Sequence, residues 1–239
     1  MKDSENNDDE QSPVERRSIR SFVIRAGRST AGQQRGLTEL FPVYGIANDT
    51  QGPIDFDTVF GRQAPRMIEI GFGAGEALLE YADEHPQLDC IGIEVHPPGV
   101  GHLLLGLEQR GLTNVRVISQ DAVEVLQRRI ALASIDHIHV FFPDPWPKKR
   151  HHKRRLIQPA FADLLTQVLV VGGVLRLATD WEHYAHHMRE VLDASSALRN
   201  LSATDGFMQR DPSRVLTRFE RRGQRLGHDV WDLAYQRIS

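Results

Sequence analysis

The stretch RMIEIGFGAGE, residues 66–76, decides the fold class of this chain. Its first half is a short apolar run typical of a buried strand, and its second half carries glycine at positions 71, 73 and 75. Glycines directly after a first strand let the backbone pass close to a ligand at the edge of a sheet. A dinucleotide fingerprint needs glycine where Glu76 stands, and a negative charge at a helix start disfavours a pyrophosphate. The turn therefore predicts a ligand without phosphates, with a purely structural tight turn as the alternative.

Strands and helices alternate along the chain after this turn. The apolar patterns predict strands at 66–70, 89–94, 115–118, 135–142 and 174–178. Between and after them, helical spacing predicts helices at 76–84, 103–110, 122–130, 159–169 and 181–192. This alternation is typical of parallel βαβ units, so we expect an α/β fold with a doubly wound, mostly parallel sheet. Short apolar stretches within 201–238 lack a helical period and predict an antiparallel C-terminal edge strand.

The composition excludes several classes of protein. The chain has 239 residues, 40% of them hydrophobic, and one cysteine, Cys90, which excludes an internal disulfide and a four-cysteine zinc site. No apolar run approaches the roughly 18–20 residues of a membrane helix. The acidic N-terminus has no apolar core of a signal peptide, so we expect a cytoplasmic protein without a membrane partner.

The net charge of −3 is an average over segregated charges. Residues 1–10 hold five acids and one lysine, whereas residues 16–35 hold six arginines and no acid. We therefore expect a disordered acidic tail and a basic N-terminal arm over residues 1–35, followed by a single domain over residues 36–239. The arm is either a solvated segment or a surface that binds phosphates.

Carboxylates stand at the carboxyl ends of four of the predicted strands, either in the strand or just after it. They are Glu69, Glu94, Asp121 and Asp144. In an open α/β sheet these strand ends line one crevice, where the acids would repel one another without a cationic or donor-rich ligand. Glu94 suits a ribose diol, Asp121 an exocyclic amine, and Glu69 an ammonium or sulfonium group. Capping of the following helices is the structural alternative, above all for Asp121.

A proline-rich loop and a basic run follow the fourth strand. In FFPDPWP, residues 141–147, the prolines stiffen the backbone that carries Asp144, and Trp146 offers a surface on which a flat base can stack. Residues 148–155 read KKRHHKRR, which predicts contacts with the phosphates of a nucleic acid. The predicted RNA-binding residues are Arg150, His151, His152, Lys153, Arg154 and Arg155. Three histidines at 183, 186 and 187 have helical spacing, but no carboxylate completes a metal site, so we predict none.

These stretches resemble known families. The acidic residue before G-x-G-x-G resembles the class I S-adenosylmethionine-dependent methyltransferases over residues 66–180, and the whole set closely resembles the bacterial tRNA (guanine-N7-)-methyltransferases. The motifs that carry this second resemblance are RSFV at 20–23 with GR at 27–28, EIGFG at 69–73, GIEVH at 92–96, FPDPW at 142–146, KRR at 153–155, ATDW at 178–181 and TRFE at 217–220. They span nearly the whole chain beyond the acidic tail, which the resemblance does not explain.

The resemblance implies a Rossmann-like fold, S-adenosyl-L-methionine as cofactor, and methylation of N7 of a guanosine in the variable loop of tRNA. It implies a cofactor site of Glu69, Gly71, Gly73, Gly75, Glu94, Asp121 and Asp144. Asp144 is also the implied catalytic residue. The implied substrate contacts are Lys148, Asp180, Thr217, Arg218, Phe219 and Glu220. We expect a monomer, with a homodimer left open.

Other functions predict other features. A methyltransferase for a small molecule or a protein has no reason to carry the basic run beside Asp144. An NAD-dependent oxidoreductase needs the glycine that Glu76 replaces. A non-catalytic RNA-binding protein needs no aligned carboxylates, and a methyltransferase acting on another RNA remains the nearest alternative.

Overall fold

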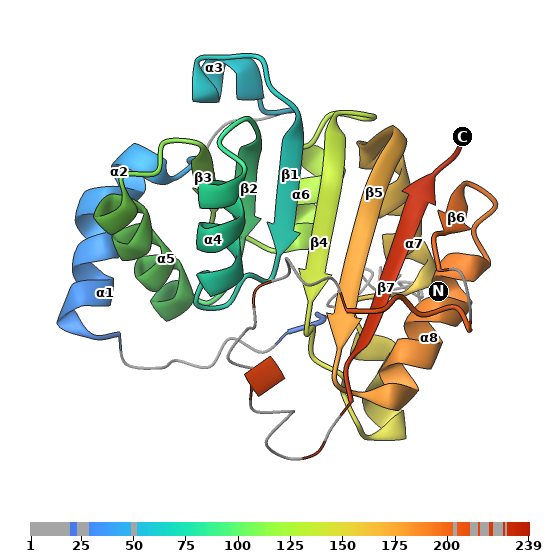
Figure 1. Cartoon of the computed structure of the whole chain (residues 1–239). Helices are drawn as coiled ribbons and strands as arrows, with labels where there is room; N and C mark the ends of the chain where they lie inside the picture. The colour runs from blue at the N-terminus through green and yellow to red at the C-terminus, as the bar shows by residue number, and fades with distance from the viewer. Residues whose placement is uncertain are drawn as a thin grey trace, which may run out of the picture.

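A seven-stranded sheet forms the centre of the computed structural model, which describes residues 20–22, 29–48, 52–202, 205–210, 215, 220–221, 227 and 229–239. The strand order is β3-β2-β1-β4-β5-β7-β6 (Figure 1). The strands are β1 (Arg66–Ile70), β2 (Asp89–Ile93), β3 (Val115–Ile118), β4 (Ile135–Phe141), β5 (Leu169–Thr179), β6 (Leu198–Asn200) and β7 (Trp231–Arg237). Strands β1 to β5 pair in parallel, and β7 pairs antiparallel with both β5 and β6. The predicted doubly wound, mostly parallel sheet with an antiparallel C-terminal strand is confirmed, but this strand, β7, lies between β5 and β6, so β6 and not β7 forms the edge.

Helices cover both faces of this sheet (Figure 1). They are α4 (Glu76–Glu84) and α5 (Pro97–Arg110) on one face, and α6 (Ala122–Arg128), α7 (Pro159–Val168) and α8 (Glu182–Asp193) on the other. Neighbouring residues of a strand point to opposite faces, so Met67 packs in the core under α4 and α5, whereas Ile68 packs in the core under α6 to α8. The bounds differ most from the prediction at α5 and β5. Helix α5 begins six residues earlier than expected because proline suits its first turn.

A helical stretch that the sequence did not predict precedes the first strand. It runs through α1 (Ala31–Arg35), a π-helical turn (Gly36–Leu40) and α2 (Phe41–Tyr44), and a short α3 (Phe56–Phe60) follows. Thr30 and Gln33 form a capping box at the start of α1. Gly36 packs against α5 so closely that a Cβ atom there would lie 2.6 Å from the Gly101 carbonyl oxygen. The predicted domain boundary at residue 36 therefore falls inside a packed helical stretch.

No described helix combines the length and the apolar character that crossing a lipid bilayer requires.

Candidate active site

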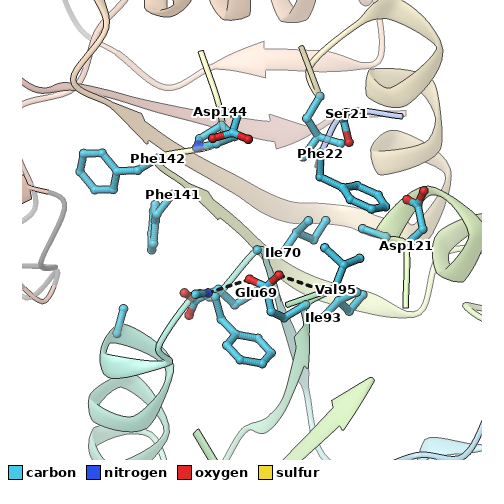
Figure 2. Close-up of a pocket in the computed structure, with 18 of the residues that line it drawn as sticks. Ser21, Phe22, Glu69, Ile70, Ile93, Val95, Asp121, Phe141, Phe142 and Asp144 are labelled. Atoms are coloured by element: carbon cyan, nitrogen blue, oxygen red, sulfur yellow. Dashed lines mark hydrogen bonds between the residues drawn. The ribbon is translucent and has the colours of Figure 1, made fainter. Parts of the chain in front are cut away.

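A cleft of about 240 Å³ lies at the carboxyl ends of strands β1 to β4. All four predicted carboxylates, Glu69, Glu94, Asp121 and Asp144, contribute to its lining. Figure 2 shows Asp121 and Asp144 at two ends of this cleft, with Glu69 on the side of the central strands. The parallel sheet brings these residues together because it places the ends of its strands at one edge.

The glycine turn between β1 and α4 adopts backbone angles that side chains disfavour. Gly71, Gly73 and Gly75 have φ of 73°, 59° and 80°. A Cβ atom on Gly99 of α5 would lie only 2.1 Å from the Gly73 carbonyl oxygen, so the start of α5 packs directly on the turn. Gly71 and Gly73 line the cleft, whereas Gly75 precedes α4 and packs against Leu103. Gly75 therefore supports the conformation of the turn without lining the cleft.

The side chain of Glu94 is fixed by backbone amides. Its Oε2 atom accepts a hydrogen bond from the Gly73 amide at 2.9 Å. Its Oε1 atom accepts from the amides of Val95 at 2.7 Å and His96 at 2.9 Å. Three of the roughly four lone-pair sites of the carboxylate are used in this way, so the side chain is held in place and Oε2 can still accept a hydrogen bond from a ligand hydroxyl.

Glu69 presents a buried carboxylate whose partner is missing. The residue is 3% exposed, and its Oε2 atom has no hydrogen-bond partner. Burial, and secondarily the charge of Glu94, raises the pKa of Glu69 to about 8. A buried polar atom without a partner is costly and calls for an explanation. A ligand that carries a positive charge or hydrogen-bond donors would provide the missing partner.

Asp121 has a position that fits both of the roles that the sequence left open. Its Oδ1 atom accepts from the Val123 amide at 3.0 Å and caps α6, while the residue also lines the cleft. Burial raises the pKa of this carboxyl group. Helix capping and ligand binding are therefore compatible at this position.

The loop after β4 holds Asp144 in an exposed position on a strained backbone. Phe142 and Trp146, on either side of Asp144, have φ of 52° and 46°. Residues other than glycine rarely adopt these angles, and such strain persists only where the surroundings enforce it. The amide of Phe142 donates to the Ala178 carbonyl of β5 at 2.8 Å, which is one such restraint.

A 3₁₀ helix, Lys149–Arg154, carries the basic run away from this loop. Lys148, Lys149, Arg150 and Lys153 are exposed, whereas His151 and His152 are half-buried. Burial, and secondarily the neighbouring cations, lower the pKa of His151. The exposed lysines and Arg150 form a cationic surface next to Asp144.

The last arginine of the run, Arg155, is not on this surface. It is 2% exposed, its Nε atom donates to the Pro145 carbonyl at 3.0 Å, and its NH1 atom donates to His183 Nδ1 at 3.1 Å. Its NH2 atom is buried without a hydrogen-bond partner, so the expected contact of Arg155 with RNA stays a prediction, which the burial of the guanidinium disfavours. Arg155 braces the loop that carries Asp144.

The predicted substrate residues occupy different environments. Lys148 is exposed next to the loop, and Asp180 follows β5 without lining the cleft. Glu220 is fully buried and forms an ion pair with Arg210 at 2.6 Å. Thr217, Arg218 and Phe219 lie outside the described residues. Of the α8 histidines, His187 donates to the Ile157 carbonyl at 2.9 Å, a structural contact.

The structure adds residues that sequence reasoning missed as site residues. Ser21, Phe22, Gln120, Phe141 and Phe142 all line the cleft. In the sequence, Ser21 and Phe22 stood out only as part of the RSFV motif at residues 20–23. Nothing in that motif by itself indicates that it packs against the ends of the central strands.

Three comparisons with known proteins agree with this geometry. A family model described as "Putative methyltransferase" matches residues 63–233. Proteins named tRNA (guanine-N(7)-)-methyltransferase are 57% identical to this chain, over 93% of both chains for Ectopseudomonas mendocina (strain ymp) and over 97% of both for Stutzerimonas stutzeri (strain A1501). The solved structure of the 16S rRNA methyltransferase KamB has a TM-score of 0.57 and 14% identity, covering 82% of this chain and 99% of that one, which shows a shared fold.

Proposed function

Because the chain belongs to the tRNA (guanine-N7-)-methyltransferase family, we propose that it transfers a methyl group from S-adenosylmethionine to N7 of a guanosine in tRNA. The observation that carries this proposal is the identity to proteins of that name over nearly the whole chain. The cleft with its four carboxylates and the cationic surface beside Asp144 support it from the structure.

The residues of the cleft fit this cofactor. The unpartnered, buried carboxylate of Glu69 suits the ammonium and sulfonium charges of the methionine part. Glu94, fixed by three amides, suits the ribose hydroxyls, and Asp121 suits the exocyclic amine of adenine. Gly71 and Gly73 leave room for a close approach to the backbone. When bound, S-adenosylmethionine supplies a methyl group on a positively charged sulfur, which a neutral ring nitrogen can attack.

Asp144 acts by position and charge. Guanine N7 has a lone pair and no proton at neutral pH, so no general base is needed, and the new carbon–nitrogen bond places positive charge on the purine. A carboxylate held near the base stabilises that charge, and it also accepts from the N1–H and the N2 amine, which adenine lacks. The braced, strained loop keeps Asp144 in place for this task.

The cationic surface binds the tRNA backbone in this proposal. Lys148, Lys149, Arg150 and Lys153 reach phosphates next to the reacting base, and His151 and His152, in the same 3₁₀ helix, donate hydrogen bonds to them. Asp180 directly follows β5, and the Phe142 amide donates a hydrogen bond to the Ala178 carbonyl of that strand. This link between β5 and the loop of Asp144 supports a contact of Asp180 with the base. Glu220 is held by Arg210, and the sequence resemblance alone carries the proposed substrate contacts of Thr217, Arg218 and Phe219.

Further details complete the proposal. We place the target guanosine in the variable loop, on the basis of the sequence resemblance. The enzyme acts as a monomer in the cytoplasm, where its substrate is matured. One methyltransferase domain reaches from the helical stretch at residue 31 to the C-terminus.

The direct assay incubates the protein with S-adenosylmethionine and a tRNA transcript that carries no modifications. Borohydride reduction followed by mild aniline treatment cleaves the strand selectively at N7-methylguanosine, so the length of the fragments reports both the reaction and the position. We expect one cleavage site in the variable loop. Cleavage elsewhere would reject the proposed position. If the protein binds the cofactor but no cleavage follows, N7 of a tRNA guanosine is rejected as the acceptor.

Asp144→Asn provides the matched variant, since it keeps the shape of the side chain and removes the charge. We expect an unchanged thermal unfolding temperature and tRNA affinity, with methyl transfer reduced at least about a hundredfold, the scale of a lost electrostatic stabiliser. Near-normal turnover would contradict the role of Asp144.

A further inference from the structure

A segment far away in the sequence forms part of the cofactor cleft. Ser21 and Phe22 line this cleft together with the ends of the central strands. Figure 2 shows them on one side of it, across from Ile93 and Val95, with Phe22 on the side of Asp121. An aromatic side chain here faces an apolar wall, which is the arrangement that holds a flat ring from both sides.

Two side chains of the catalytic loop and basic run hold this segment. The indole Nε1 of Trp146 donates to the Ser21 carbonyl at 2.9 Å. Arg154 donates from Nε to the Arg20 carbonyl and from NH2 to the Phe22 carbonyl, both at 3.2 Å. The guanidinium of Arg154 also lies 4.0 Å from the centre of the Trp146 ring, so the two side chains support each other.

These contacts assign Arg154 a role beyond phosphate binding. The guanidinium has five N–H donors, and two of them are committed to the backbone of residues 20–22. Lysine at this position would keep the positive charge for RNA but lose the planar pair of donors. The hydrogen bonds to residues 20–22 therefore depend on the planar guanidinium of Arg154, and a positive charge alone is not sufficient for them.

We propose that residues 20–22 are a wall of the cofactor site, that Phe22 stacks on the adenine of the cofactor, and that Trp146 and Arg154 are positioning residues that hold this wall. The identity of the ligand rests on the function proposed above. The same loop carries Asp144, so the wall of the cofactor site and the carboxylate that orients the base form one connected unit.

The test measures the affinity for S-adenosylhomocysteine by calorimetry in the absence of tRNA. We expect Phe22→Ala to weaken this affinity about tenfold, the scale of one ring stacked on a base. Free adenosine should lose affinity by the same factor, because the lost contact is to adenine. Trp146→Phe and Arg154→Lys should each weaken S-adenosylhomocysteine about three- to fivefold, the scale of one or two hydrogen bonds.

Arg128→Lys is the matched control, since Arg128 is exposed on α6 and does not line the cleft. This variant should bind S-adenosylhomocysteine with the affinity of the wild type. The double variant Phe22→Ala, Arg154→Lys should bind no more weakly than Phe22→Ala alone, because both changes remove the same contact. Additive losses would overturn the positioning role.

A purely RNA-binding role for Arg154 predicts a different result. Arg154→Lys would then leave S-adenosylhomocysteine affinity unchanged, and such an outcome overturns the proposal. The measurement contains no tRNA, so a failure to methylate tRNA would reject the proposed function without affecting this result. Thermal unfolding of each variant confirms that the measured protein is folded.

Discussion

Glu69→Gln should stabilise the cofactor-free protein at alkaline pH while it impairs cofactor binding. In the wild type, burial raises the pKa of Glu69 from 4.5 to about 8. At about 1.4 kcal/mol per pKa unit, the ionised carboxylate costs up to about 4–5 kcal/mol in the folded state. The folded state therefore retains a proton that the unfolded chain releases, so the free energy of unfolding falls as the pH rises from the unfolded pKa to the folded one.

Between about pH 5 and about pH 8.5, this single group lowers the free energy of unfolding of the wild type by roughly 3–4 kcal/mol. Glutamine has no proton to release, so Glu69→Gln should lack this slope. Urea unfolding of the cofactor-free protein, followed by circular dichroism at both pH values, measures the difference. Glu84→Gln, an exposed change on α4, should keep the wild-type slope.

S-adenosylhomocysteine should stabilise the wild type and have little effect on Glu69→Gln, because a ligand stabilises only the state that binds it. Parallel pH profiles for the wild type and Glu69→Gln would contradict this prediction, since they would show that ionisation of Glu69 does not destabilise the folded state. Unimpaired binding by Glu69→Gln would separately refute its role toward the ligand's positive charge.

Three further predictions concern other parts of the site. Gly99→Ala should lower the free energy of unfolding by about 1–3 kcal/mol and weaken cofactor binding, because its Cβ atom meets the Gly73 carbonyl at 2.1 Å; urea unfolding and calorimetry that match the wild type would show that the turn tolerates the shift. Arg155→Lys should reduce kcat about tenfold and leave the Kd for tRNA unchanged, because it loosens the Pro145 carbonyl; steady-state kinetics showing a weaker Kd at normal kcat would instead support a phosphate contact. Changing Lys149 and Lys153 together to Ala should weaken tRNA binding and reduce the slope of log affinity against log salt by up to about 2, and an unchanged slope in a salt titration would remove both residues from the RNA surface.

Local sequence patterns were sufficient to predict the sheet and the position of the cleft. Buried parallel strands are short apolar runs, and their carboxyl ends meet at one edge, so Glu69, Glu94, Asp121 and Asp144 could be brought together without coordinates. The helical stretch from residue 31 was missed because its polar sequence and its glycines look like a linker. Its stability comes from close packing of Gly36 on α5, a contact that only the fold reveals.

Individual roles within the basic run could not be predicted for the same reason. Lys153, Arg154 and Arg155 are equivalent by charge, yet one is exposed, one holds residues 20–22, and one is buried under the Asp144 loop. A side chain's role depends on the carbonyls that surround it, and those of Arg20 and Phe22 come from a segment more than a hundred residues away. The same holds for Glu69. A strand pattern indicates that this residue is buried, but it does not indicate that its Oε2 atom has no hydrogen-bond partner.

Replacement of the acceptor atom shows directly whether the enzyme methylates N7 of the guanosine. A tRNA transcript with 7-deazaguanosine at the target position lacks the N7 atom and keeps the remaining hydrogen-bonding groups of guanine. With labelled S-adenosylmethionine, the proposed function requires full methyl transfer to the unmodified transcript and none to the 7-deaza transcript, at equal affinity for both. Methyl transfer to the 7-deaza transcript at a comparable rate would contradict it, because the enzyme would then be methylating another atom.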